Sequence, residues 1–277
     1  MKKVILFLSI FSPIVAFAQV ERTYEYERLR IGVEAGIEFL DGTINKPAAV
    51  RENHSYYYDS YYAKDYYYGG YIDDYQTITR YYFGVKPEYS LNHRFTIASG
   101  VRFMYNHNNL ISDREYFLWK VEETALTTNY ARVKNVEQNN LYFGVPVEMK
   151  FFMSKKDLRV RPYVKAGASF NFLLSSSTTP YFVNGRMEQK YASDILNQLE
   201  KVDFLSTSIF ASLGLKIGRM NHPFGTIEFQ LPLLLFGQNT PSSFVKSSTV
   251  NEGVALQISF YLPVGEQKLS YKYKSRR

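Results

Sequence analysis

The sequence predicts an all-β protein, an eight-stranded antiparallel up-and-down transmembrane β-barrel with long outer loops. Three observations predict this fold. The chain begins with an export signal, eight segments place their charges opposite their apolar residues, and the connections between these segments alternate in length. A charge that faces lipid at mid-membrane costs about 2–4 kcal/mol, so a barrel must turn such residues toward its interior.

The first eighteen residues have the composition of a secretory signal peptide. Two lysines precede an apolar run from Val4 to Val15, and Ala16-Phe17-Ala18 forms an A-x-A cleavage site. The run is shorter than the roughly 20 residues that a membrane-spanning helix needs. We therefore expect residues 1–18 to be removed and residues 19–29 to form an N-terminal periplasmic segment.

The composition disfavours a helical membrane protein. The chain is 45% hydrophobic and 17% aromatic, yet its mean hydropathy is -0.27, and no second apolar stretch reaches helix-spanning length. Dispersed apolar residues suit a barrel, or a soluble β-sandwich as the alternative fold. The absence of cysteine excludes disulfides, thiolate catalysis and cysteine-based metal sites.

Eight segments have the alternation and the length of roughly ten residues that a tilted strand needs to cross a membrane. They are Arg30–Leu40, Thr79–Tyr89, Arg94–Tyr105, Leu141–Met153, Arg161–Leu174, Thr207–Ile217, Gly225–Leu235 and Val254–Leu262. In the first segment, Val33 and Ile37 alternate with Glu34 and Glu38. The barrel is therefore expected to occupy residues 30–262.

The charges inside these segments share the face opposite the apolar residues. We predict that they point into the barrel and pair there, because an unpaired buried charge is strongly destabilising. The predicted lumen charges are Glu34, Glu38, Lys86, Glu88, Arg102, Glu148, Lys150, Lys165, Lys216 and Glu228. Side chains nearly fill an eight-stranded barrel, which favours a structural plug over the alternative of a gated ion path.

The connections between the segments alternate between short and long, an asymmetry typical of outer-membrane barrels. The short polar turns are Ser90–His93, Ser154–Asp157 and Gly218–Phe224. The long connections are about Asp41–Ile78, Asn106–Asn140, Ser175–Ser206 and Phe236–Gly253. This order places both chain termini in the periplasm, where residues 263–277 are expected to form a basic tail.

Aromatic residues near the segment ends predict girdles at the two membrane interfaces. Beside the long loops these are Tyr81, Tyr82, Phe83, Phe103, Tyr105, Tyr142, Phe143, Phe170 and Phe172. At the opposite ends they are Phe151, Phe152, Phe260 and Tyr261. The alternative interpretation is that they are core aromatics of a β-sandwich.

The first long loop is rich in tyrosine, which offers large, rigid contact area with a polar tip and suits recognition of a protein or a surface glycan. The candidate recognition residues are Tyr56, Tyr57, Tyr58, Tyr61, Tyr62, Tyr66, Tyr67, Tyr68, Tyr71 and Tyr75. A compatible alternative is a hairpin that extends the barrel wall around Gly69-Gly70. In the third long loop, Ser193 is expected to cap a short helix that reaches Leu199.

Two pairs of segments resemble a known family. Residues 141–152 (LYFGVPVEMKFF) with 161–167 (RPYVKAG), and residues 83–87 (FGVKP) with 100–103 (GVRF), are similar to the strands of small outer-membrane β-barrel domain proteins common in Bacteroidota. The resemblance covers most of the mature chain and implies a fold rather than an activity. Some members are porin-like, and one branch includes the accessory barrel of type IX secretion.

We therefore predict an outer-membrane protein with a structural or interaction role through its surface loops, including a role as a subunit of an envelope or secretion assembly. A narrow porin is the first alternative. A lipid-modifying enzyme that uses His107, Ser112 and Asp113 is the second. The expected partners are outer-membrane lipid and either an envelope protein or a surface glycan, but no nucleic acid.

No catalytic, cofactor-binding or metal-binding residue is predicted. The histidines at positions 54, 93, 107 and 222 lack metal-ligand spacing, and no phosphate-binding or calcium-binding loop motif occurs. The chain is therefore not expected to be an enzyme.

Overall fold

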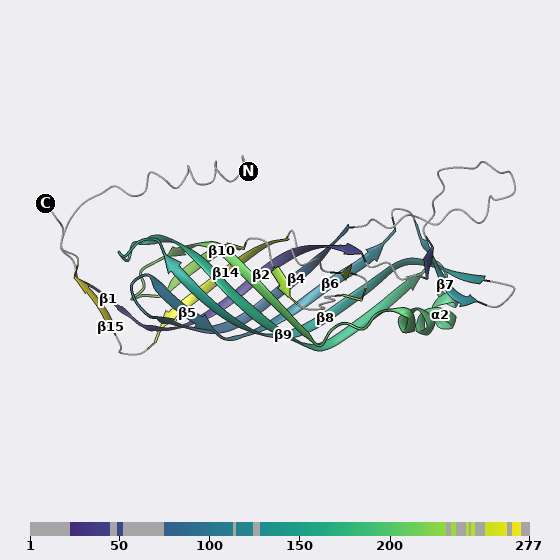
Figure 1. The fold of residues 1–277 in the computed structure, drawn as a ribbon, viewed down its shortest axis with the longest axis horizontal. Helices are drawn as coiled ribbons and strands as arrows, with labels where there is room; N and C mark the ends of the chain where they lie inside the picture. The colour runs from purple at the N-terminus through teal and green to yellow at the C-terminus, as the bar shows by residue number, and fades with distance from the viewer. Residues whose placement is uncertain are drawn as a thin grey trace, which may run out of the picture.

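The computed structural model describes residues 23–44, 49–51, 75–112, 115–123, 128–230, 234–236, 242–243, 245–246, 253–264 and 268–272. Tilted strands form an elongated barrel, and strands on one side continue past one of its ends (Figure 1). We call the end with the longer connections the loop end. The other end, with the short turns and the ribbon of β1 (Thr23–Glu27) and β15 (Lys268–Lys272), is the turn end.

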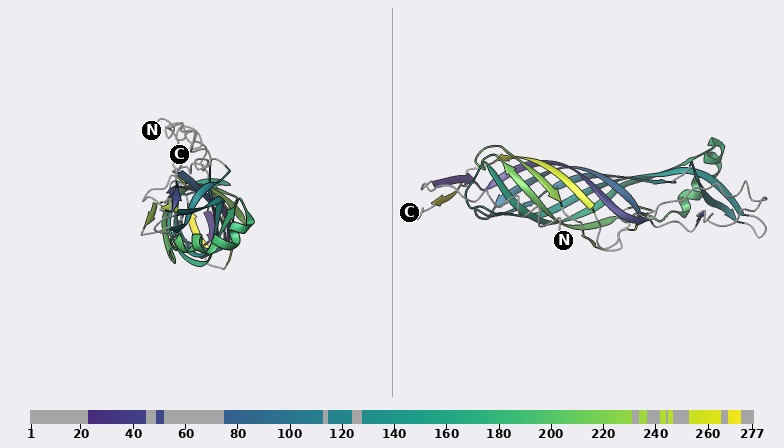
Figure 2. Two further views of the ribbon diagram at one scale, coloured as in Figure 1. Left: turned by 90° about the vertical axis from the view of Figure 1, so that its right-hand side faces the viewer. Right: turned by 90° about the horizontal axis from the view of Figure 1, so that it is seen from above.

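Eight antiparallel strands form the ring, one of them in two pieces. They are β2 (Leu29–Ile44), β4 (Tyr75–Ser90), β5 (Phe95–Ser99) with β6 (Val101–Ile111), β8 (Thr128–Phe152), β9 (Val160–Phe182), β10 (Leu205–Ile217), β11 (Phe224–Gln230) and β14 (Gly253–Pro263). Strand β14 pairs with β2 and closes the ring (Figure 2). The predicted eight-stranded antiparallel barrel is confirmed.

The strand predicted at Arg94–Tyr105 is interrupted at Gly100, between β5 and β6. Its register with β4 and with β8 is the same before and after the break. This register places Ser99 opposite Pro87 and Gly100 opposite Pro146. Proline has no N–H to donate, so the ladder loses hydrogen bonds here while the register is kept.

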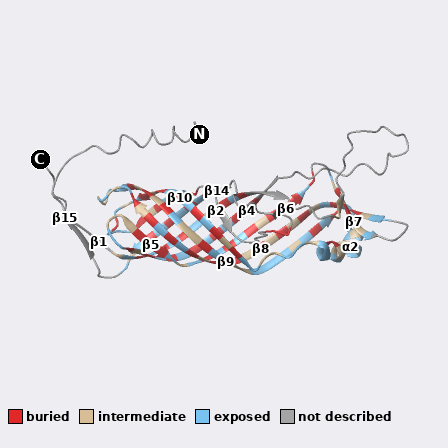
Figure 3. Cartoon of the chain, viewed as in Figure 1, coloured by how far each residue is buried: buried red, intermediate tan, exposed pale blue. Residues whose placement is uncertain are grey.

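Buried and exposed residues alternate along the wall (Figure 3). In β14, Leu256 and Ile258 are 46% and 57% exposed, whereas Gln257 between them is 1% exposed. Most exposed wall residues are apolar and most buried ones are polar or charged. This inverted arrangement suits a wall surrounded by hydrocarbon.

Four of the predicted girdle aromatics face the interior, so the girdle prediction is wrong for them. They are Tyr82, Tyr142, Phe152 and Tyr261, each at most 4% exposed. Each has an outward-facing neighbour in the same strand, such as the exposed Tyr81 and Phe260. Because side chains alternate between the two faces of a strand, only one of two consecutive aromatics can reach the lipid.

Each of four inward-facing aromatic rings lies opposite a glycine on the neighbouring strand. The pairs are Tyr261 with Gly32, Tyr82 with Gly36, Tyr163 with Gly214, and Phe210 with Gly167. A Cβ atom on Gly32 would lie 2.5 Å from Cε1 of Tyr261. The glycines thus leave room for large rings inside a narrow barrel, and the rings cover the glycine backbone.

We expect Gly32→Ala to lower the free energy of unfolding by about 1–3 kcal/mol, because its methyl group overpacks against Tyr261. Urea unfolding, followed by the loss of the fast-migrating folded band on an unheated gel, measures the change. Gly225→Ala is the matched control, since its Cβ would approach Ser259 O only to 3.7 Å. Equal midpoints for the two variants would contradict the prediction.

At the loop end, β6, β8 and β9 continue beyond the ring and carry β7 (Phe117–Glu123), β3 (Val50–Arg51) and helix α2 (Gly185–Gln198). We call the segments 106–140 and 173–204, with β3, the head. Parts of the segments predicted as loops at Asn106–Asn140 and Ser175–Ser206 are therefore strand or helix. The prediction was wrong there because polar residues such as Asn109 and Asn139 alternate without an apolar signal.

At the turn end, β1 (Thr23–Glu27) pairs with β15 (Lys268–Lys272) as a separate antiparallel ribbon. The N-terminal segment and the basic tail, predicted as two separate segments, are thus joined by backbone pairing. Between β11 and β14, β12 (Leu234–Phe236) pairs with β10 and β13 (Val245–Lys246) pairs with β2. Within the described residues, no helix combines the length and apolar character required to cross a bilayer.

Candidate functional site

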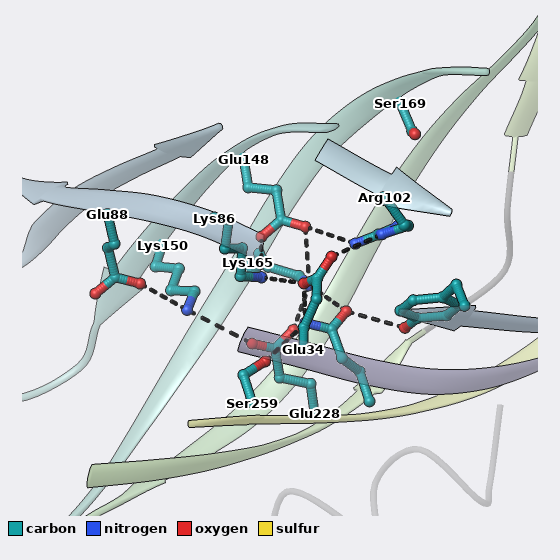
Figure 4. A network of polar contacts seen from close by, with 12 residues as sticks. Glu34, Lys86, Glu88, Arg102, Glu148, Lys150, Lys165, Ser169, Glu228 and Ser259 are labelled. Carbon is teal, nitrogen blue, oxygen red and sulfur yellow. Dashed lines mark hydrogen bonds and ion pairs between the residues drawn. The ribbon is translucent and has the colours of Figure 1, made fainter. Parts of the chain in front are cut away.

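The ten predicted lumen charges are all buried, each at most 3% exposed. Ion pairs connect eight of them into one network: Glu34, Lys86, Glu88, Arg102, Glu148, Lys150, Lys165 and Glu228 (Figure 4). The other two lie apart from it. Glu38 pairs with Arg80, and Lys216 pairs with Asp157.

Glu148 lies at the centre of the network. Its Oε2 is 2.7 Å from Lys86 Nζ, and its Oε1 is 3.3 Å from Arg102 Nη2 and 3.5 Å from Lys165 Nζ. Lys86 and Arg102 also contact Glu34, at 2.6 and 2.7 Å. Two buried carboxylates therefore share the same two cations, and the loss of either carboxylate leaves buried positive charge.

Aromatic residues and a methionine fill the interior near the turn end. Phe152, Tyr163, Met220, Phe224 and Tyr261 form one buried cluster. Lys150 Nζ donates to Tyr261 Oη at 2.7 Å, and Tyr163 Oη donates to Glu228 Oε1 at 2.6 Å. These bonds join the cluster to the charge network above it.

Arg161 fastens the short turns across this end of the barrel. Its guanidinium donates to the backbone carbonyls of His93 and Ser154, and it lies 4.2 Å from the ring centroid of Phe152. Arg161 and Arg30, which pairs with Glu88, were missed as interior residues. Both residues have the same strand parity as the predicted lumen charges, so the alternation in the sequence did indicate that they face inward. They were missed because each is the first residue of its predicted segment, where a charge also suits the membrane interface.

A segment of the last long connection enters the mouth at the loop end. Ser242 and Ser243 are 0% and 6% exposed. Gln138 binds Ser243 twice: its Oε1 accepts from Ser243 N at 2.9 Å, and its Nε2 donates to Ser243 Oγ at 2.6 Å. Described residues thus lie in the mouth, the middle and the turn end of the interior, and a cavity of about 310 Å³ beside Gln138 and Ser243 remains open at the mouth.

The head contains most of a buried hydrophobic cluster that continues into the ring through Leu40, Ile78 and Phe210. Buried members from its strands are Leu110, Phe117, Trp119, Ala131, Val133, Val136 and Phe182. Ile195 of α2 is 0% exposed and joins them. Trp119 Nε1 donates to Gln198 Oε1 at 2.8 Å, which ties the helix to β7.

Helix α2 begins earlier than predicted. Its N-cap is Asn184, whose Oδ1 accepts from Arg186 N at 3.0 Å, so Ser193 lies within the helix and does not cap it. Asparagine is a preferred N-cap residue, and it was the available sequence signal. Met187, Tyr191, Ala192 and Ile195 recur at helical spacing and face the head core.

Most of the candidate recognition tyrosines, Tyr56 to Tyr71, lie outside the described residues, and only the backbone of Tyr75 is described, as the first residue of β4. The structure does not bring together the residues of the enzymatic alternative. His107 Nδ1 lies 2.8 Å from Asn139 Oδ1, whereas Ser112, on the opposite strand face, donates to the carbonyl of Tyr116. Asp113 is outside the described residues, which contain no cluster of three potential metal ligands.

Comparison with known proteins gives low sequence identity throughout. No curated protein matches the chain. One similar solved structure is OprG of Pseudomonas aeruginosa, with 9% sequence identity, coverage of 86% of this chain and 98% of OprG, and a TM-score of 0.37. Another is Ail, the attachment invasion locus protein of Yersinia pestis, with 12% identity, coverage of 85% of this chain and 99% of Ail, and a TM-score of 0.29. A third is the N-terminal β-barrel domain of Pseudomonas aeruginosa OprF, with 10% identity, coverage of 84% of this chain and 97% of that domain, and a TM-score of 0.29.

A protein-family model also matches most of the chain. Residues 17–254 match the family described as outer membrane protein beta-barrel domain, and they include seven of the eight ring strands and the first two residues of β14. The closed ring and its inverted burial pattern are those of a membrane β-barrel, and the family match places the protein in the outer membrane. The chain belongs to the outer membrane protein beta-barrel domain family.

Proposed function

We propose that this protein is a non-conducting outer-membrane barrel whose head acts as an interaction surface outside the cell, with the turn end in the periplasm. The observation that carries the proposal is the packed hydrophobic cluster of the head, which is anchored on the ring through Leu40, Ile78 and Phe210. A barrel does not need such a core to remain in a bilayer, because its wall faces hydrocarbon directly. A folded head instead holds a surface in one conformation before binding, which reduces the entropy cost of association.

The head also exposes apolar side chains that its own core does not cover. Ile111 is 57% exposed, and Tyr181 and Val183 on the β9 extension are each 42% exposed. Exposed apolar residues close together are typical of contact surfaces when they lie outside the lipid. The partner class that we propose is a protein of the envelope.

The paired charges and the aromatic cluster inside the barrel argue against the porin alternative. A diffusing ion would have to separate at least one of the shared pairs around Glu148, and it would meet the aromatic cluster at the turn end. Separating an ion pair leaves a buried charge without its counter-ion, which is strongly unfavourable. The lumen charges are thus proposed to act as a structural plug.

Planar-bilayer recording tests the proposed absence of conductance. We expect purified protein to give no discrete current steps under conditions in which a general porin, inserted in the same bilayers, gives them. Reproducible steps that disappear in variants of Lys86 or Arg102 would establish an ion path through the network and contradict the proposal.

Proteolysis of intact cells tests the orientation and the interaction surface. A protease site placed beside α2 should be cut from outside, whereas a tag after Arg277 should stay protected until the outer membrane is opened. A photo-crosslinker at Val183 should then capture one envelope protein, and the same group at Val160, which is 50% exposed at the turn end, should not. The similarity of residues 141–152 and 161–167 to barrels that include a type IX secretion accessory supports testing secretion components first.

A further inference from the structure

The lipid-facing wall carries a groove near the turn end, across β4, β5, β8 and β9. Its volume is about 430 Å³, and most of the residues that line it are apolar. Tyr89, Ile97 and Met149 form one side, whereas Pro87 and Ser99 lie on the other. The groove therefore opens toward the hydrocarbon and not toward the interior.

Register explains why the wall is hollowed here. Leu29, Tyr89, Ile97, Met149 and Ala166 are successive partners across five strand segments, and all face outward. The next outward row contains Pro87, Ser99, Val147 and Ala168. The small side chain of Ser99 leaves a depression in the second row beside the larger Ile97 and Met149 of the first, at the interruption of the strand next to Gly100.

Basic residues border this groove on the side of the turns. Arg28 Nη1 donates to the hydroxyl of Tyr89 at 3.3 Å, and the guanidinium of Arg94 lies 5.8 Å from the ring centroid of Phe151. The neighbouring β8–β9 turn adds Lys155, Lys156 and Arg159.

Negative charge is scarce at this rim. Among the described side chains of the three short turns, the acidic residue is Asp157, which is paired with Lys216. His93 is mostly neutral near neutral pH, because burial and then the positive charges of Arg161 and Lys155 hold its pKa below the usual value. The rim beside the groove is therefore basic.

We propose that this site binds an anionic glycerophospholipid of the periplasmic leaflet, with an acyl chain in the groove and its phosphate beside Arg28 and Arg94. The wall position selects a hydrocarbon chain, and the basic rim selects a negative headgroup. Basic residues near a membrane surface attract anionic lipid, and their contributions add. The choice of leaflet rests on the orientation in the proposed function.

Lipid retention in native mass spectrometry tests the site. The probes are phosphatidylglycerol and phosphatidylethanolamine with the same acyl chains, added in equal amounts to the detergent-solubilised full chain. We expect phosphatidylglycerol to be retained about fivefold or more over phosphatidylethanolamine. Equal retention of the two lipids would overturn the proposal.

Variants separate the headgroup contact from the groove. Arg28→Gln combined with Arg94→Gln should remove the preference for phosphatidylglycerol, whereas Arg219→Gln, which changes an exposed base on the distant β10–β11 turn, should keep it. Ser99→Leu, which fills the groove, should lower retention of both lipids. Ala35→Leu, on an outward position of β2 outside the groove, should not.

The readout distinguishes this proposal from the proposed function. Retention in detergent does not depend on which end of the barrel faces the periplasm, so a reversed orientation would change the leaflet but not the preference. If Arg219→Gln weakens binding as much as the double variant, the contact is a diffuse charge effect and the site is refuted. All variants must first migrate as folded barrels on unheated gels.

Discussion

Glu148→Gln is expected to lower the free energy of unfolding by about 3–5 kcal/mol. The substitution keeps the shape of the side chain but removes the negative charge that Lys86, Arg102 and Lys165 contact. Glu34 then faces Lys86 and Arg102 alone, and Lys165 retains Glu228 as its counter-ion. The excess positive charge stays buried, where water cannot solvate it.

Urea titration of the protein in lipid vesicles, with gel mobility as the readout, measures this loss. Glu188→Gln is the matched control, because Glu188 is exposed on α2 and the same atoms change. Adding Lys86→Met to Glu148→Gln should recover part of the stability, since it removes one of the cations left without a partner. A midpoint for Glu148→Gln that equals the control would show that the network contributes little to the barrel's stability.

Trp119→Ala is expected to unfold the head while the barrel stays folded. Trp119 is 0% exposed, its ring lies 6.1 Å from that of Phe117, and its indole holds α2 through Gln198. Truncation of a buried tryptophan costs about 3–5 kcal/mol, which is a large fraction of the stability of a small core. Leu40, Ile78 and Phe210 of the ring belong to the same cluster, but the ring is also held by its closed strand pairing and by the charge network around Glu148.

Hydrogen exchange resolves the two regions. Amides of α2 and β7 should lose protection in the variant, whereas those of β10 and β14 should keep it, and gel mobility should be unchanged. Phe204→Ala is the control, because Phe204 lies at the edge of the head and is 68% exposed. Loss of protection in β10 and β14 as well would mean that the head and barrel unfold as one unit.

The barrel could be predicted from sequence because a membrane imposes the same rule on every strand. Side chains that face lipid are apolar and those that face the lumen are not, so Lys86 and Glu148 are assigned to the interior by parity alone. The position of a residue in its strand does not, however, indicate which charge on another strand it pairs with. Pairs such as Lys86 with Glu148 depend on how far each strand is shifted relative to its neighbours, and this shift is set by turns and ring closure.

The head could not be predicted because the membrane rule ends at the interface. Strand β8 has 25 residues, far more than the bilayer requires, and its outer part alternates between polar residues such as Asn139 and Asn140. A pattern with polar residues on both faces resembles a loop. Trp119 and Ile195 are apolar core residues that suggest burial, but they lie 76 positions apart in the sequence and meet only in the folded structure.

The ribbon of β1 and β15 has a consequence for the speed of folding. It extends the β2–β14 seam, at which the first and last strands of the ring meet. Closure of such a distant pair costs the most chain entropy, so we expect closure of this seam to be the slow step in assembly. Early pairing of the two chain ends would hold β2 and β14 close together before the wall closes. The segment outside the membrane then acts as an intramolecular tether that raises the rate of closure, and its removal slows assembly more than it changes the finished barrel.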